Sequence, residues 1–402
     1  MNHAITGEDI SRSEEMVQQT NPSQRLYYMD NLRALAMLLG VLFHAALAYS
    51  PLMHNLWFTT SSESSWLFDF FAFFTHLFRM PVFFLISGFF AIMLIEKRGV
   101  SGLLKNRAVR IVLPFVIFFP VLLIAYMVSI GWAVENVKNL SPMLQFIKMM
   151  QANPNAPQPP LTTMHLWFLY NLFMFVLVLA VAHKANLLNR QWVTQLVSPK
   201  FVIFVFPLLL VPALANQFAP HPAPEKFYPE LWSFGFYGLF FLVGALIYNK
   251  QSILVEFERY KHWLLLVSLV LYGYFFYTLP TTITPEQTMQ MMAGFKFDMS
   301  HLPVAIAEAY VAVYMSIYLL IIAKKFLNQH SATIKLIADS SYWIYLVHMP
   351  VLLMVQFVLA DVDLGIWIEF LVSSLLTFLI CFVSYLIIVR WTPIGWMLNG
   401  KK

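Results

Sequence analysis

The sequence has little charge and almost no cysteine. Only 11% of its 402 residues are Asp, Glu, Lys or Arg, whereas about a quarter of the residues of a soluble domain are charged. Because 60% of the residues are hydrophobic, there are too few polar side chains to cover a soluble core of this length. The composition therefore excludes a soluble globular protein and indicates a surface that faces lipid.

Missing motifs exclude several chemistries. The single cysteine, Cys381, has no partner for an intrachain disulfide. The chain has no GxxxxGK[ST] loop, glycine-rich dinucleotide fingerprint, HExxH or GxSxG, so P-loop phosphoryl transfer, hydride transfer, a zinc site and a serine nucleophile elbow have no support. We therefore expect no bound metal and no bound cofactor. A buried imidazole is then the one group able to act as a base near neutral pH, with Arg residues to hold anions.

Ten apolar windows approach the roughly 20 residues that a helix needs to cross about 30 Å of hydrocarbon. Three are weaker: 32–49 contains two ionisable residues, 201–216 is short and contains two prolines, and 262–279 is barely long enough. The other seven are 80–95, 111–133, 164–182, 231–248, 301–323, 341–359 and 364–389. The sequence predicts an all-α, polytopic membrane bundle of about ten transmembrane helices.

The cations are distributed unevenly between alternate gaps. Of the 25 Lys and Arg residues, all but Arg79, Lys138, Lys148, Lys226 and Lys296 fall on one side of the predicted bundle. The positive-inside rule places this side, with both termini, in the cytoplasm. We expect a flexible cytoplasmic tail over 1–25, a single transmembrane domain over 26–392 and a short cytoplasmic tail over 393–402.

The first window carries the most informative pair of ionisable residues. Arg33 and His44 are eleven positions apart, which on a helix is three turns plus about 20°, so both lie on one stripe about 16 Å apart along the axis. Gly40 lies between them and has no side chain, so the helix surface between Arg33 and His44 has low relief. Ionisable residues in lipid cost at least about 2.5–3.5 kcal/mol and are therefore functional candidates. The alternative is that Arg33 is a headgroup anchor paired with Asp30, and that His44 hydrogen-bonds a neighbouring helix.

The second window brings two further groups of candidates. His76 and Arg79 are one turn apart at its predicted outer end and share a face, although an interfacial anchor is the alternative for Arg79. Ser87 and Gly88 form a small patch that a helix or a ligand can approach closely.

A pair of arginines precedes the third window. Arg107 and Arg110 share a face at the predicted cytoplasmic mouth. Such a pair suits a ligand with phosphate groups, since guanidinium groups bind phosphate bidentately, while a topology anchor fits the same position.

The later windows add three candidates. His165 is predicted at the outer boundary of the window 164–182. Glu308 lies two turns inside the window 301–323, which begins at its outer boundary with His301. His348 lies about two turns inside the window 341–359, just before Pro350, which frees a backbone carbonyl for a ligand or a helix contact.

Five motifs occur in order between about residue 26 and about residue 390. They are R-x10-H in the first window, FRMPVFFLISGFF, K-x-R-x-x-R-I-x-x-P before the third window, HLWFL and SYWIYLVHMP. In this order they resemble membrane acyltransferase family 3. The resemblance implies a ten-helix inner-membrane enzyme that moves an acyl group from cytoplasmic acyl-CoA to a hydroxyl of an extracytoplasmic carbohydrate. The first two motifs are most similar to a subgroup that O-succinylates periplasmic glucans, which implies succinyl-CoA as the donor.

The resemblance also implies roles for individual residues. The functional His of the family corresponds to His44 and its Arg to Arg33. Our hypothesis is that Arg33, Arg107 and Arg110 bind acyl-CoA and that His44 removes the proton of the sugar hydroxyl, with an acyl-His intermediate as the alternative. The acyl or acceptor group is then assigned to His76, Arg79, Ser87, His165, Glu308 and His348. The competing hypothesis is a secondary transporter that uses these His, Arg and Glu side chains as a substrate or proton path.

Overall fold

The computed structural model describes residues 26–156, 160–188, 193, 195–284, 287, 299–329 and 331–400, and within these ranges it contains helices and no strand. The predicted tail over 1–25 lies outside the described residues. The helices, with short 3-10 or π segments labelled η, are α2 (Tyr27–Ala46), η1 (Leu47–Tyr49), α3 (Trp66–Arg107), η2 (Ala108–Val112), α4 (Leu113–Asn136), α5 (Pro142–Ala152), η3 (Met164–Leu166), α6 (Trp167–Lys184), η4 (Phe201–Val205), α8 (Phe206–Leu214), α9 (Leu231–Ser233), η5 (Phe234–Gly238), α10 (Leu239–Tyr248), α11 (Ile253–Glu258), α12 (Lys261–Thr278), η6 (Met299–His301), α14 (Leu302–Phe326), α15 (Ala332–Leu359), α16 (Ile366–Ser384), η7 (Tyr385–Val389) and α17 (Pro393–Asn399).

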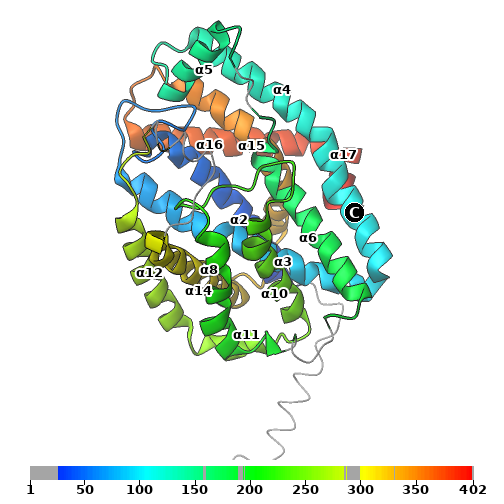
Figure 1. Ribbon diagram of the computed structural model, residues 1–402. Coiled ribbons are helices and arrows are strands. Elements are labelled where there is room, and N and C mark those ends of the chain that lie inside the picture. The colour runs from blue at the N-terminus through cyan, green and yellow to red at the C-terminus, as the bar shows by residue number, and fades with distance from the viewer. Residues whose placement is uncertain are drawn as a thin grey trace, which may run out of the picture.

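The helices form one bundle with α2 and α3 in its interior (Figure 1). On one side α2 packs against α15 and α16, and on the other side α3 packs against α10 and α14. The predicted window 32–49 therefore corresponds to a helix, α2, that is surrounded by other helices. This position allows Arg33 and His44 to avoid lipid.

One group of helix ends meets at what we term the Arg110 end. The Asn31 side chain near the start of α2 donates to the Leu327 carbonyl after α14 at 2.8 Å. The Tyr342 hydroxyl of α15 donates to the Arg110 carbonyl at 2.6 Å, and the Arg110 guanidinium donates to the Asn399 carbonyl of α17 at 3.1 Å. The first turns of α2 and α15, the last turn of α14, η2 and α17 therefore lie together.

The opposite group of helix ends is termed the Asp69 end. The hydroxyl of Ser50, just after η1, hydrogen-bonds the Asp69 carboxylate in the first turn of α3. The hydroxyl of Ser141, just after α4, donates to the Phe58 carbonyl in the loop before α3 at 2.7 Å. The start of α3 and the end of α4 thus lie at the same end of the molecule.

Among the described residues, seven helices are long and apolar enough to cross a membrane. One of them, Trp66–Asn136, has 71 residues, and it turns back because Gly99 has a φ of 68° that only glycine adopts readily. A described helix overlaps each of the ten predicted windows, but Phe201–Leu214 is short and α12 is not among the seven. The chain is a multi-pass membrane protein, while the number of ten crossings and the side of the termini stay predictions.

The predicted start of the second helix was wrong. We expected the window to begin at residue 80, with His76 and Arg79 at the boundary. Instead α3 begins at Trp66, where the Ser65 hydroxyl accepts the Leu67 backbone N–H, and it runs through Pro81. The preceding segment WLFDFFAFFTHLF is mostly apolar and aromatic and supports four more turns. His76 and Arg79 therefore lie about three turns inside α3, with Arg79 buried and His76 half-buried.

The segment predicted as a short C-terminal tail contains a helix. Over the described part of 393–402, Pro393–Asn399 forms α17, which places Leu398 in the core at 4% exposure. The Asn399 side chain donates to the Asp339 carbonyl at 2.9 Å. This segment is packed on the Arg110 end, because its Leu and Asn side chains find apolar and carbonyl partners there.

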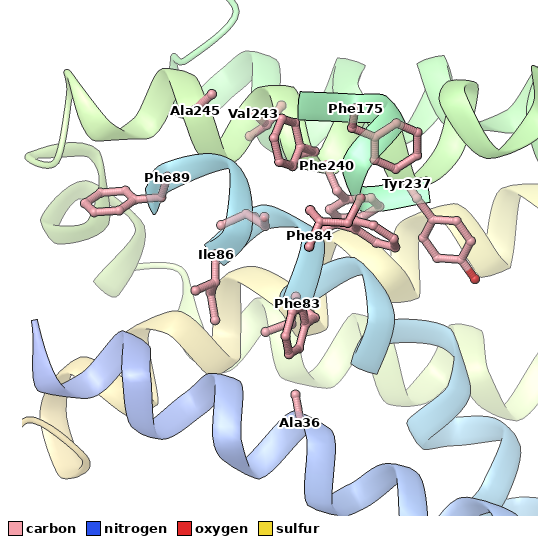
Figure 2. Close-up of a cluster of buried hydrophobic side chains, with 14 of the residues drawn as sticks. Ala36, Phe83, Phe84, Ile86, Phe89, Phe175, Tyr237, Phe240, Val243 and Ala245 are labelled. Carbon is pink, nitrogen blue, oxygen red and sulfur yellow. The ribbon is translucent and has the colours of Figure 1, made fainter. Parts of the chain in front are cut away.

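The Ser87–Gly88 patch is the point where α3 and α10 approach most closely. A Cβ on Gly88 would collide with the Phe241 carbonyl, and one on Gly244 would collide with the Leu85 carbonyl. Figure 2 shows the aromatic rings of Phe84, Phe240 and neighbouring residues filling the space beside this crossing. In lipid, where apolar burial between helices gains little, such close packing holds helices together.

We predict that Gly88→Val destabilises the bundle. The new side chain would overlap backbone that cannot move aside, so the cost is at least about 1–3 kcal/mol. The measurement is the apparent melting temperature of the detergent-purified protein. Gly273→Val in α12, where nothing lies within 4 Å of the glycine, is the matched control and should melt close to wild type. Equal melting temperatures for the two variants would contradict this account.

Candidate functional site

A cavity of about 600 Å³ lies at the Arg110 end. Its wall contains the cationic side chains Arg33, Lys97, Arg98, Arg107 and Arg110, with Asp30 and Asp339 as the acidic residues. The wall extends along α2 as far as Met37 and along α3 back to Phe83, and it includes Ser87. The excess of guanidinium groups makes this cationic cavity suited to an anion with phosphate groups.

The arginines of the cavity are only partly neutralised by the protein. Arg33 approaches Asp30 at 3.5 Å, but its side chain is 38% exposed. Arg110 donates to the Asn399 carbonyl, so α17 forms part of the cavity wall. The Nε of Arg107 is buried and has no hydrogen-bond partner among the described residues. Among the arginines of the cavity, Arg107 is thus the one with a buried donor that lacks an acceptor.

Deeper in the bundle, three histidines from different helices form an imidazole cluster, defined as His44, His165 and His348. The ring centroids of His44 and His348 are 5.4 Å apart, and those of His165 and His348 are also 5.4 Å apart. Trp57, from the loop after η1, stacks on His44 with centroids 5.8 Å apart and planes within 12°. Within the described ranges, no three His, Cys, Asp or Glu side chains are arranged to hold a metal ion.

Pro350 explains how His165 joins this cluster. A proline at 350 has no N–H for the Leu346 carbonyl one turn earlier. His165 takes that place, with its Nε2 2.9 Å from the carbonyl, and its Nδ1 faces the Tyr126 hydroxyl at 3.1 Å. The carbonyl that we predicted to be freed by Pro350 is therefore used in a helix contact. His165 thus lies in η3, at the start of its apolar span, and contacts the Leu346 carbonyl in the middle of α15.

Arg79 lies between the cationic cavity and the imidazole cluster. Its guanidinium lies over the Phe43 ring at 4.5 Å, and its Nη1 is 3.2 Å from the position of a Cβ on Gly40. Gly40 is one turn before His44 and one turn after Met37, the last α2 residue of the cavity wall. The thin stripe at Gly40 thus accommodates the Arg79 side chain.

The charge of Arg79 has no acidic partner in the described parts of the chain. Arg79 is 6% exposed, its Nε and Nη1 are buried without hydrogen-bond partners, and no described carboxylate lies within 4.0 Å. An unpaired buried cation costs several kcal/mol. Such a group fits a site in which an anion, or a developing negative charge, is bound.

A second polar group surrounds His76 and Glu308. The His76 Nε2 is 2.9 Å from the His221 carbonyl, and the Glu308 carboxylate accepts from the His221 backbone N–H at 3.3 Å. Burial lowers the pKa of His221 to about 3, so this ring is neutral and its 3.4 Å contact with Glu308 is a hydrogen bond rather than an ion pair. The Tyr237 hydroxyl occupies the other ring nitrogen at 3.0 Å. Glu308 is therefore held within the protein.

The structure brings the predicted site residues into three neighbouring groups. Arg33, Arg107 and Arg110 line the cationic cavity together with Ser87, which we had assigned to the acyl or acceptor group. The remaining predicted residues lie deeper. His44, His165 and His348 form the imidazole cluster. His76 and Glu308 contact His221, and Arg79 lies over Phe43.

Several residues of the site were missed by the sequence analysis. His221 lies in a proline-rich loop, where the sequence gives no sign that the chain enters the bundle. This loop is held in place by the Glu225 carbonyl, which accepts from the Thr163 backbone N–H at 2.7 Å. Trp57 and Tyr126, which contact His44 and His165, were not singled out in the sequence.

The family of the chain follows from comparison with known sequences. A model of the acyltransferase domain of the acyltransferase 3 family matches residues 26–387. The chain therefore belongs to this family, and the resemblance inferred from the five motifs is confirmed. Membership of this family, together with the seven apolar helices, defines the chain as a multi-pass membrane acyltransferase.

Several similar curated proteins are named glucans biosynthesis protein C. Those from Salmonella paratyphi B and Salmonella dublin are each 25% identical over 398 residues, covering 94% of this chain and 96% of the relative. The protein from Salmonella heidelberg is 23% identical over 405 residues with the same coverage. No solved structure matches.

Proposed function

We propose that the protein transfers an acyl group from acyl-CoA to a hydroxyl of a periplasmic glucan or a related carbohydrate, across the bacterial inner membrane. The observation that supports this most is that α2 carries Arg33 in the wall of the cationic cavity and His44 in the imidazole cluster. We assign the Arg110 end to the cytoplasm, because most Lys and Arg residues fall on that side. The names of the similar proteins favour a glucan as the acceptor.

In the proposed reaction, His44 acts as a general base. The ring is partly accessible, whereas its Nδ1 is buried. The acceptor oxygen attacks the thioester carbonyl, the new C–O bond forms and the C–S bond breaks. The hydroxyl proton passes to His44 and then to the CoA thiolate, so the transfer is balanced without another reactant.

Arg79 suits the far end of a succinyl donor. A succinyl group carries a free carboxylate beyond its thioester, and a buried guanidinium without an acidic partner can hold it by charge-assisted hydrogen bonds. The position of Arg79 beside Gly40, between the cavity and His44, supports this role. Stabilisation of the negative charge on the thioester oxygen is the competing role for the same group.

We predict that His44→Ala abolishes acyl transfer. Loss of a general base lowers rates by about 10²–10⁴-fold. Membrane vesicles supplied with labelled acyl-CoA and glucan should release CoA in step with acylated glucan for wild type, and not for this variant. His262→Ala, an exposed histidine at the start of α12, is the control and should retain activity. Full activity of His44→Ala would end the proposal, and movement of label without thioester cleavage would favour a transporter.

We predict that Arg107→Met weakens the binding of CoA. Loss of a charge-assisted hydrogen bond costs about 1.5–3 kcal/mol, which is about a 10- to 100-fold rise in Kd. Titration calorimetry on the purified protein measures it. Arg259→Met is the matched control, because this arginine stacks on Tyr260 and does not line the cavity. Unchanged affinity in the Arg107 variant would remove the cationic cavity as the donor site.

We predict that Arg79→Met changes the choice of acyl donor. The kcat/KM for succinyl-CoA should fall about 100-fold, since the carboxylate loses its partner, while that for butyryl-CoA should stay the same or rise. The two donors differ at the far end of the acyl group only. An equal loss for both donors would instead assign Arg79 to the thioester oxygen.

A further inference from the structure

We infer that His348 is a positioning residue for His44: in the reacting state its Nε2 accepts the Nδ1–H of the His44 imidazole, a bond that the two atoms do not make in this structure. This inference rests on the proposed function, because it assigns the partner of the general base. It concerns the two ring nitrogens of the imidazole cluster that are buried without hydrogen-bond partners.

The hydrogen bond at the other side of the ring fixes the tautomer of His348. Its Nδ1 is 2.7 Å from the Tyr345 carbonyl. A carbonyl oxygen only accepts, so the proton is on Nδ1 and the neutral ring has its lone pair on Nε2. A second proton on Nε2 would be buried without a partner, in a side chain that is 3% exposed. His348 therefore presents a hydrogen-bond acceptor to the interior of the site.

His44 needs such an acceptor. For the Nε2 of His44 to take a proton from a hydroxyl, the proton of the neutral ring has to be on Nδ1. This Nδ1 is buried and unpartnered among the described residues. Left without an acceptor, a buried donor costs about 1–3 kcal/mol, so this tautomer is disfavoured unless a partner is supplied.

Among the described rings in contact with His44, His348 is the one that can accept. Phe43 meets the imidazole edge-on and has no acceptor atom, and Trp57 is a donor only, with its Nε1 directed to Gln356 at 3.3 Å. The centroids of His44 and His348 are 5.4 Å apart with planes tilted by 37°. The two nitrogens are not hydrogen-bonded in the structure, but at this separation a rotation of the rings brings facing nitrogen atoms to about 3 Å, the range of an N–H···N hydrogen bond.

The consequence for the reaction is a base of fixed tautomer and orientation. With Nδ1–H directed to His348, the Nε2 lone pair of His44 faces away from α15 and is free for the acceptor hydroxyl. When His44 takes the proton, the same bond becomes charge-assisted and stabilises the imidazolium. The anchoring of His165 on the Leu346 carbonyl supports the segment of α15 that carries His348.

The test compares His348→Gln with His348→Met. A glutamine amide oxygen can reach the position of Nε2 and accept the bond, whereas methionine has a similar length without a comparable acceptor. In the vesicle assay we expect His348→Met to lower kcat about 10- to 100-fold with KM unchanged, and His348→Gln to recover most of this loss. In the His44→Ala background, His348→Met should cause no further loss, because the bond it removes is already gone.

The controls separate this inference from the proposed function. His262→Met should have wild-type kcat, and CoA binding and melting temperature should be the same for both His348 variants. Wild-type kcat in His348→Met, or equal losses in the Gln and Met variants, would overturn the inference while leaving acyl transfer by His44 intact. Absence of transfer in the wild-type protein would instead overturn the proposed function.

Discussion

The fold depends on one constraint: polar side chains inside a lipid-embedded bundle have to find their partners within the protein. Two short segments at helix starts help to meet this need. η3, which precedes α6, brings His165 to the freed carbonyl of α15, and the loop before α9 brings His221 to Glu308. Both segments are joined to each other through the Glu225 carbonyl. They give partners to the buried polar groups of Tyr126, Tyr237 and Glu308.

The polar atoms that stay unsatisfied are then informative. Among the described residues they include the Nδ1 of His44, the Nε2 of His348, two nitrogens of Arg79 and the Nε of Arg107. They belong to the cationic cavity, to the Arg79 side chain beside Gly40 and to the imidazole cluster, which are the parts of the proposed substrate site. By contrast, Glu308 is equally buried but already accepts two hydrogen bonds from His221, which favours a structural role for it.

The positions of the helices could be predicted from the sequence because lipid exposure leaves long apolar runs. The boundary of α3 could not, since Asp69, His76 and Arg79 lower the apolar content of its first turns, although Asp69 and Arg79 are buried in the protein and His76 is half-buried. The grouping of the arginines at the Arg110 end follows from helix periodicity. The pairing of His165 with α15, and the entry of His221, depend on contacts between segments far apart in the sequence, and no local pattern reports these.

The arrangement along α2 limits how an acyl group could pass from the cationic cavity to the imidazole cluster in the proposed site. Met37 ends the cavity wall and His44 is seven residues further, about 10 Å along the axis. Arg79 occupies the intervening position at Gly40. In the proposed reaction, an acyl group that reaches His44 from the cavity would pass this guanidinium, so the side chain proposed to hold a carboxylate would also limit access to the proposed base. A larger residue at Gly40 would displace the guanidinium. The missing side chain at Gly40 therefore makes room for Arg79 and does not leave an open passage along α2.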